Sequence, residues 1–162
     1  MASLFRRILV PHDFSAPADH ALRVAAGLAG AKGRLTVLHV VTPFSPVTGL
    51  PPEGLAWIPP PDLVASEQRQ LEHRVARALG RRRAPRVRCR VVIGDPFHRI
   101  AEAARLADSV VMATAGRTGL TRLVIGSVAE KVVRHSPVPV LTVRPAATRP
   151  RSSKRPRRPT PR

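Results

Sequence analysis

The chain has 162 residues, a net charge of +18 and 43% hydrophobic residues, enough for one domain with a proper core but not for two. No apolar run approaches the about 18 residues of a membrane span, and the N-terminus lacks a long apolar core and a cleavage-like end. We therefore expect a cytoplasmic protein with no membrane contact. Cys89 is the only cysteine, which excludes an internal disulfide and a cysteine-based zinc cluster.

Apolar segments rich in β-branched residues alternate with longer helical patterns. The predicted strands span residues 5–10, 34–41, 86–92, 109–114 and 138–143, and the predicted helices span 16–31, 63–79, 96–107 and 128–135. Asp95 and Pro96 are a favoured pair for opening the third helix. Strict alternation forces parallel pairing with right-handed crossovers. The predicted fold class is α/β, a doubly wound five-stranded parallel sheet sandwiched by four helices, with its ligand crevice where the strand order reverses.

Two segments depart from this regular alternation. Residues 43–61 contain seven prolines, which predicts a long surface loop, and such loops are often lids or contact sites. The final strand, Val138 to Val143, contains Pro139, and a proline belongs at a sheet edge. An apolar edge strand invites a partner, and a second copy of the chain is the simplest one. We therefore expect a homodimer formed through this strand.

Part of the positive charge lies at the C-terminus, where residues 145–162 hold seven Arg or Lys, five prolines and no acid. This segment has no large apolar side chain to bury, so a disordered Arg/Pro-rich tail is predicted. A second basic cluster, Arg81 to Arg90, joins a helix end to a strand. Such cations bind phosphates without sequence preference. One hypothesis is therefore an interaction module that contacts nucleic acid or acidic partners, and a tail that only aids solubility is the simpler alternative.

The most informative motif follows the fourth strand, where Val110 to Gly116 leads through a glycine loop to Gly126 and Ser127. A buried strand that breaks at small residues and re-enters a helix leaves outward-facing backbone N–H groups, as in phosphate sites of α/β folds. This predicts a nucleotide ligand. Ser127 and Glu130 also fit a capping box, and both roles can coexist because a cap uses only some of the about four free N–H groups.

The polar residues after the first strand are further candidates. Asp13 fits either a turn or N-cap acid or a ligand contact, and His12 has no carboxylate or thiol partner in the sequence. The histidines show no metal-like spacing, so no metal site is predicted. The chain has no Gly-x-Ser-x-Gly elbow and no Walker-type loop, so no catalytic residue is predicted. We expect a protein that is not an enzyme, in which any ATP turnover would be slow.

Several segments resemble the signatures of the universal stress protein family: Arg7 to Ser15, Leu35 to Val41, Gly94 to Pro96 and Gly126 to Val140. The resemblance covers residues 5 to 144. It implies a universal stress protein domain over residues 1–144, with an adenine nucleotide alpha-hydrolase-like fold and the tail beyond it. It further implies a cytoplasmic homodimer that acts in stress adaptation. Many members bind ATP or a related adenine nucleotide, which makes ATP with Mg²⁺ the expected cofactor.

The resemblance also assigns roles by position. Gly116, Gly126 and Ser127 would contact the phosphates, Asp13 would lie on the ribose or base side, and Val41 would contact the adenine through its backbone. The first loop would be lined by Pro11, His12 and Ser15. The crevice wall would be lined by Met112, and the phosphate end by Arg117, Val128 and Ala129. Binding members have glycine where this chain has Ala113. This alanine costs about 1 kcal/mol or more if φ there is positive, and its Cβ blocks a close ligand approach.

Overall fold

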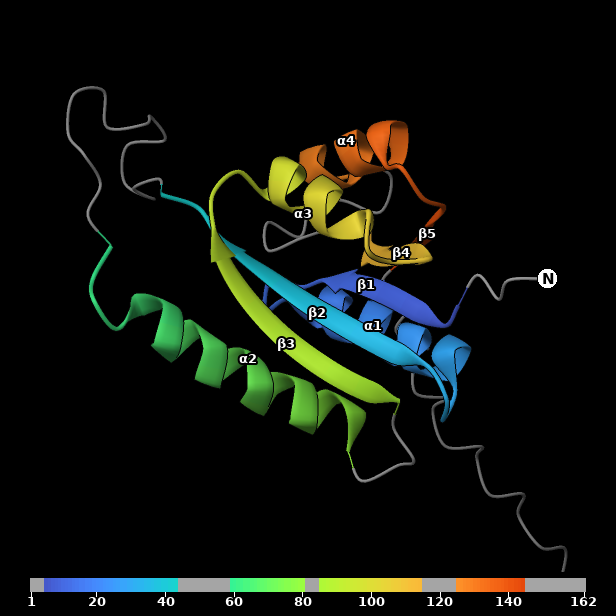
Figure 1. The fold of residues 1–162 in the computed structure, drawn as a ribbon, viewed down its shortest axis with the longest axis horizontal. Coiled ribbons are helices and arrows are strands. Elements are labelled where there is room, and N and C mark those ends of the chain that lie inside the picture. Colours follow the sequence, from blue (N-terminus) through green and yellow to red (C-terminus); the bar gives the residue numbers. More distant parts are fainter. Residues whose placement is uncertain (1–4, 44–58, 81–84, 115–124, 145–162) are drawn as a thin grey trace, which may run out of the picture.

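The computed structural model describes residues 5–43, 59–80, 85–114 and 125–144 (Figure 1). Its elements are, in chain order, β1 (Arg7–Pro11), α1 (Ala16–Ala29), β2 (Arg34–Val41), α2 (Leu63–Leu79), β3 (Arg86–Ile93), α3 (Pro96–Ala104), β4 (Ser109–Ala113), α4 (Ser127–His135) and β5 (Val140–Val143). The strands pair in parallel in one sheet of order β3-β2-β1-β4-β5. The predicted five-stranded doubly wound fold is confirmed.

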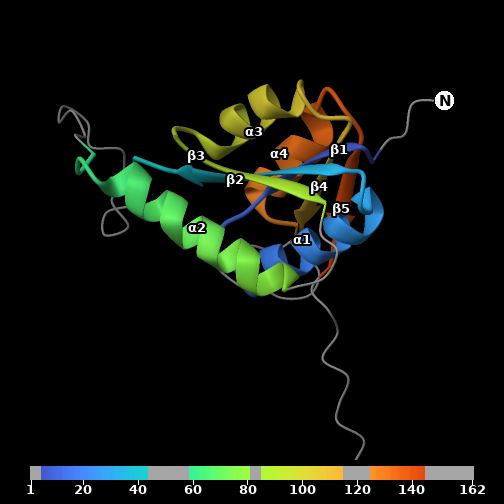
Figure 2. The same ribbon diagram turned by 60° about the horizontal axis from the view of Figure 1, so that its bottom comes forward.

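Helices cover both faces of the sheet, α1 and α2 on one face and α3 and α4 on the other (Figure 2). Val10, Val37 and Leu22 belong to the core on the α1 and α2 side. Leu9 and Val110 belong to the core on the other side. Successive residues of a strand thus enter opposite cores, which is why β1 and β4 have almost continuous apolar sequences.

Local sequence signals set several helix ends. The Ser15 hydroxyl accepts a hydrogen bond from the N–H of Ala18 at the start of α1. The Asp95 carboxylate accepts one from the N–H of His98 at the start of α3, with Pro96 as the first helical residue, as predicted. These caps fix where each helix leaves the carboxyl end of the preceding strand.

A few predicted boundaries were wrong. Helix α3 ends at Ala104 instead of at position 107, because the next three N–H groups each bond to a carbonyl three residues earlier and form tight turns. Strand β5 begins at Val140, so Pro139 precedes the strand, and β5 is an edge strand as predicted. The predicted tail and most of the proline-rich loop lie outside the described residues. Among the described helices, none has the length and apolar character needed to cross a membrane.

Candidate functional site

A cavity of about 280 Å³ lies at the carboxyl ends of β1, β2 and β4. β1 and β4 are neighbours in the sheet, and the strands after each of them extend in opposite directions, so the strand order reverses here. Open parallel sheets bind ligands at such points. The lining is Pro11, His12, Asp13, Ala18, Leu38, His39, Val40, Pro96, Ile100, Met112, Ala113, Thr114, Gly126, Ser127, Val128 and Ala129.

The start of α4 presents free backbone N–H groups to this cavity. Ser127, Val128 and Ala129 form the first turn of α4, and no described side chain caps their N–H groups. The N–H of Gly126 is engaged, because it donates to the Thr114 carbonyl at 2.8 Å. The positive end of the α4 dipole therefore faces the cavity, with three N–H donors that no described side chain engages.

The predicted capping box is wrong. Gly126, not Ser127, is the N-cap of α4 and has no side chain to offer. The Glu130 carboxylate lies 3.0 Å from Arg134 instead of reaching back to the helix start. Of the two N–H groups that a capping box would have used, that of Glu130 donates to the Gly126 carbonyl at 2.9 Å, and that of Ser127 has no side-chain partner within the described residues.

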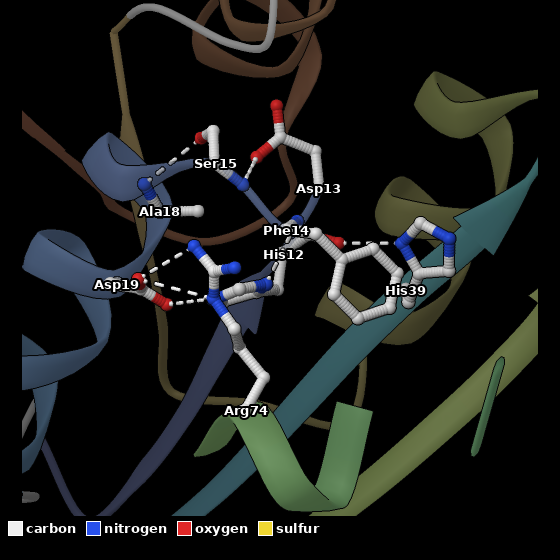
Figure 3. Close-up of polar contacts among 8 residues, drawn as sticks. All are labelled: His12, Asp13, Phe14, Ser15, Ala18, Asp19, His39 and Arg74. Atoms are coloured by element: carbon white, nitrogen blue, oxygen red, sulfur yellow. Dashed lines mark hydrogen bonds and ion pairs between the residues drawn. The ribbon is translucent and has the colours of Figure 1, made fainter. Parts of the chain in front are cut away.

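The loop between β1 and α1 forms another wall and has a strained backbone (Figure 3). Among the described residues other than glycine, only Phe14 has a positive φ, of 64°, a conformation that costs about 1–2 kcal/mol. Two neighbours stabilise it: the N–H of Phe14 donates to His12 Nδ1 at 3.1 Å, and the N–H of Ser15 donates to Asp13 Oδ1 at 3.0 Å. Asp13 is thus a turn acid, as one of the two alternatives proposed, and it also lines the cavity.

A chain of polar contacts extends from this loop to α2. Because His12 Nδ1 accepts the Phe14 N–H, the ring proton is on Nε2, which lies 3.1 Å from Asp19 Oδ1. Arg74 of α2 donates to both oxygens of Asp19, with Nε 3.0 Å from Oδ1 and Nη2 2.9 Å from Oδ2. The prediction that His12 lacks a carboxylate partner is wrong, because the turn into α1 brings Asp19, seven positions along the chain, to its Nε2.

This arrangement sets the protonation states of the group. Burial lowers the pKa of His12, against the opposing effect of Asp19, so the imidazole is neutral around pH 7. Burial alone would raise the pKa of Asp19, but the hydrogen bonds and charge of Arg74 outweigh it, so this pKa lies below its ordinary value. A neutral His12 and an ionised Asp19 suit a positioning role in the loop.

His39 connects the loop to β2 and α2. Its Nδ1 donates to the carbonyl of His12 at 2.7 Å, and its ring lies 4.4 Å, centroid to centroid, from the ring of Phe14. Its Nε2 lies 3.8 Å from a carboxylate oxygen of Glu67. The strained loop is therefore held from α1, β2 and α2 together.

Ala113 ends β4, where its partner in β5 is Val143. Its φ is not positive, so the conformational penalty considered from the sequence does not apply. Its Cβ is part of the cavity lining, and the effect of that Cβ on a ligand stays a prediction.

The structure brings most of the predicted site residues together. Nine of them line the cavity: Pro11, His12, Asp13, Met112, Ala113, Gly126, Ser127, Val128 and Ala129. Ser15 instead caps α1, and Val41 lies just beyond the lining with its carbonyl accepting the Gly94 N–H at 3.0 Å. Gly116 and Arg117 lie outside the described residues.

Sequence reasoning missed several residues of the site, among them His39, Thr114, Asp19 and Arg74. A signal for His39 and Thr114 existed, because both lie at or just beyond the carboxyl end of a predicted strand. No sequence signal joins Asp19 to Arg74, which are separated by 55 positions. Their contact depends on how α1 and α2 pack.

The cavity is apolar on its sheet side and polar at its helix starts. Its described lining contains no Lys or Arg, and Asp13 is its only acid. The donors for an anion in this lining are therefore uncharged, and they include the backbone N–H groups of α4 and the hydroxyls of Thr114 and Ser127. No group of three His, Cys, Asp or Glu in the described residues is placed to hold a metal. The cavity can bind a molecule with an apolar part and an anionic end.

The cysteine of the chain lies outside this cavity. Burial raises the pKa of Cys89 in β3 to about 11, so its thiol stays protonated, as suits a half-buried strand residue.

Comparison with known proteins gives a consistent result. The model of the universal stress protein family matches residues 4–144. A universal stress protein of Methanocaldococcus jannaschii is 31% identical over 144 residues, covering 88% of this chain and 84% of the relative.

Solved structures show the same similarity. A protein from the universal stress protein family from Burkholderia pseudomallei has a TM-score of 0.60 and 33% identity, covering 90% of this chain and 100% of that chain. The universal stress protein from Archaeoglobus fulgidus in complex with dAMP has a TM-score of 0.60, covering 86% of this chain and 98% of that chain. It is 19% identical, so this likeness concerns the fold alone.

Proposed function

The chain belongs to the universal stress protein family, and from this premise we propose that it is a cytoplasmic stress-response regulator that binds ATP or another adenine nucleotide as a homodimer. Mg²⁺ would accompany the phosphates, and the protein would act by binding and not as an enzyme. The observation that carries the proposal is the apolar cavity at the point where the strand order reverses, with three uncapped N–H groups of α4 facing it.

The lining suits the parts of a nucleotide. Leu38, Val40 and Met112 offer an apolar surface for the base, and the start of α4 offers N–H donors to phosphate. Asp13 keeps one carboxylate oxygen beyond its turn contact, which can accept from ribose hydroxyls. The relative from Archaeoglobus fulgidus with dAMP has the same fold, and its ligand belongs to the same chemical class.

The proposed nucleotide site is tested by calorimetry on purified protein after acid extraction of any bound nucleotide. Titration with Mg-ATP, ADP, AMP and cyclic AMP should give saturable heat for at least one of them. An empty extract together with no heat up to millimolar ligand would reject the proposal.

Gly126→Ala locates the site within the molecule. Gly126 has a φ of −61°, and among the described residues a Cβ there would meet only the Thr114 carbonyl oxygen, at 3.6 Å, so the fold around it tolerates alanine. We expect the nucleotide affinity to fall about tenfold, which is about 1.4 kcal/mol, because the methyl group narrows the approach to the N–H groups. Gly27→Ala in α1, which has open space around its Cβ, is the control and should leave the affinity unchanged. Equal affinities of the two variants would place the nucleotide elsewhere.

The proposed homodimer uses the open edge of the sheet. Among the described strands β5 pairs only with β4, and Leu141 on it is 39% exposed. Leu141→Asp should yield a monomer in sedimentation equilibrium because it places a charge in an apolar interface. Val64→Asp on α2, also 39% exposed, is the matched control and should leave the dimer intact. A dimer that survives Leu141→Asp would rule out this edge as the interface.

The alternative is a nucleotide-free dimer that acts as an interaction module, with the basic tail contacting nucleic acid or acidic partners. The seven cations in residues 145–162 favour it, because they release counterions from phosphate. The test compares the DNA affinity of the full chain with that of a variant ending at Pro145 over a series of salt concentrations. If the two proteins have equal affinity at each concentration, the tail does not contact the DNA.

A further inference from the structure

A second cleft, of about 300 Å³, lies on the sheet at the opposite end from the nucleotide cavity. Five of its thirteen lining residues are arginines, which lie in the amino-terminal parts of three strands: Arg7, Arg34, Arg86, Arg88 and Arg90. Ala103 near the end of α3 and the tight turns that follow this helix, at Leu106 and Ala107, close one side of it. In Figure 1 no helix lies in front of the lower right parts of β2 and β3, where these strands begin. We name this site the arginine cleft.

Strand register arranges the five arginines in two rows. Arg7 of β1 pairs with Arg34 of β2, and Arg34 pairs with Arg86 of β3, so one row crosses three strands. Neighbouring strands are about 4.8 Å apart. The other row runs along β3 through Arg86, Arg88 and Arg90, whose alternate positions are exposed and about 6.6 Å apart. Arg86 is the corner that the two rows share.

Most of this charge is not neutralised by the residues that the structure describes. Arg7 forms a two-bond contact with Asp108, with nitrogen–oxygen distances of 2.7 and 2.9 Å. Within the described ranges no acid forms an ion pair with any of the other four arginines. Like charges on paired positions of adjacent strands destabilise a sheet. The fold therefore carries an electrostatic cost that an anion in the arginine cleft would relieve.

We propose that the arginine cleft binds the phosphate backbone of a single-stranded nucleic acid, with successive phosphates along the β3 row. Guanidinium groups suit phosphate because they donate two parallel hydrogen bonds. The spacing along β3 is comparable with the separation of successive phosphates on one strand. The cleft lining contains no aromatic side chain, so the contact reads charge and not base identity.

A single strand fits these observations better than other polyanions. The β3 row is a single line of charges, which matches the one line of phosphates in a single strand, and an acidic peptide would have to place its carboxylates at the same spacing by its own sequence. A nucleic acid carries a charge at every repeat whatever its sequence. The net charge of +18 attracts such a strand over a longer range.

The test measures fluorescence anisotropy of a labelled 20-nucleotide single-stranded DNA of mixed sequence, using the full-length protein over a series of salt concentrations. The variant Arg86→Gln/Arg88→Gln/Arg90→Gln should bind about tenfold more weakly than the wild type at low salt. Its slope of log affinity against log salt should be shallower by about 2, because each lost contact with a single strand contributes about 0.7.

The control variant Arg23→Gln/Arg69→Gln/Arg77→Gln removes the same charge from exposed positions on α1 and α2. It should leave the slope nearly unchanged. Equal losses in the two triple variants would show that only net charge matters and would overturn the proposal. Thermal unfolding checks that both variants remain folded.

Competition experiments and chemical-shift mapping decide which polyanion binds in the arginine cleft. The proposal would be overturned if duplex DNA or polyglutamate displaced the strand at equal charge concentration. It would also be overturned if pyrophosphate bound more tightly than the strand. Amide chemical shifts on the full chain supply a readout that the tail cannot mask. Shifts in β3 on adding the strand are expected, and shifts absent from β3 would refute the assignment.

Discussion

At the carboxyl end of the sheet the groups placed to meet an anion are backbone N–H groups of α4, whereas at the amino end they are arginine side chains. The first set is fixed by the helix and lies in a cavity with apolar walls. The second set lies on an exposed sheet face and depends on strand register. One end therefore suits a compact ligand with an apolar part, and the other suits an extended polyanion.

The two ends also differ in how they are stabilised. The carboxyl end holds a strained loop through the contacts of His12, Asp19 and Arg74. The amino end has one comparable contact, between Arg7 and Asp108, in which the Arg7 side chain is 60% exposed. Ion pairs in contact with water contribute little to stability, so the same kind of substitution should have unequal effects at the two ends.

The largest expected effect is that of Asp19→Ala. It removes the acceptor of His12 and the partner of Arg74, and we expect the free energy of unfolding to fall by about 2–3 kcal/mol. Urea unfolding at pH 7.5 measures it. Asp62→Ala is the control, because Asp62 makes no side-chain cap bond at the start of α2. A loss below about 0.5 kcal/mol for Asp19→Ala would show that the loop does not depend on this contact.

The next prediction concerns pH. Because the pKa of His12 is lower in the folded protein than its ordinary value of 6.5, the unfolded chain takes up this proton first as the pH falls. The contribution of His12 to stability is therefore complete above about pH 6.5 and is lost as the pH falls toward its folded pKa. Urea unfolding at pH 7.5 and 5.5 should show that the free energy of unfolding changes less between these two pH values for His12→Gln than for the wild type. His73→Gln, at an exposed position of α2, should behave as the wild type, and identical pH profiles of all three proteins would contradict the assignment.

Asp108→Asn sharpens the comparison from the amino end. Asparagine keeps an acceptor for the N–H of Arg7 but removes the charge that neutralises its guanidinium. We expect the affinity for single-stranded DNA to rise about threefold and the salt slope to steepen by about 0.7, with a stability loss below about 1 kcal/mol. Glu130→Gln removes the same charge from α4 and is the matched control. Equal gains in both variants would argue against a role for Arg7.

The smallest effect is expected for Ser109→Ala, also at the amino end. The Ser109 hydroxyl is buried and has no hydrogen-bond partner among the described residues, so its removal should stabilise the fold by up to about 1 kcal/mol. Ser136→Ala provides the contrast, since the Ser136 hydroxyl donates to the Val138 carbonyl at 2.7 Å and its loss should destabilise the protein. Thermal unfolding distinguishes the two. A destabilised Ser109→Ala protein would indicate a partner for this hydroxyl.

Periodicity and alternation were sufficient to predict the fold, because each strand and helix buries side chains at regular spacing. The positions of Asp95 and Pro96 predicted a helix start correctly, because an N-cap and a proline at the first helical position act locally. The start of α4 was predicted less well. Ser127 and Glu130 satisfy the capping pattern, but the Gly126 N–H bonds to Thr114 and shifts the N-cap by one residue.

Contacts between distant elements could not be predicted from the sequence. The partner of His12 comes from α1 and that of Asp19 from α2, so this chain of contacts exists only after both helices have packed. The two rows of the arginine cleft likewise require the register of β1, β2 and β3. The sequence showed an arginine-rich strand, but not that Arg7 and Arg34 lie beside it.

Gly126 also bears on how the sequences of such proteins evolve. Its backbone conformation is open to any residue, and a methyl group there would touch the described part of the chain only at ordinary contact distance. Packing against these residues therefore does not require glycine at this position. If the space in front of α4 is kept for a ligand, descendants that abandon the ligand are free to accumulate larger residues at position 126 while keeping their architecture.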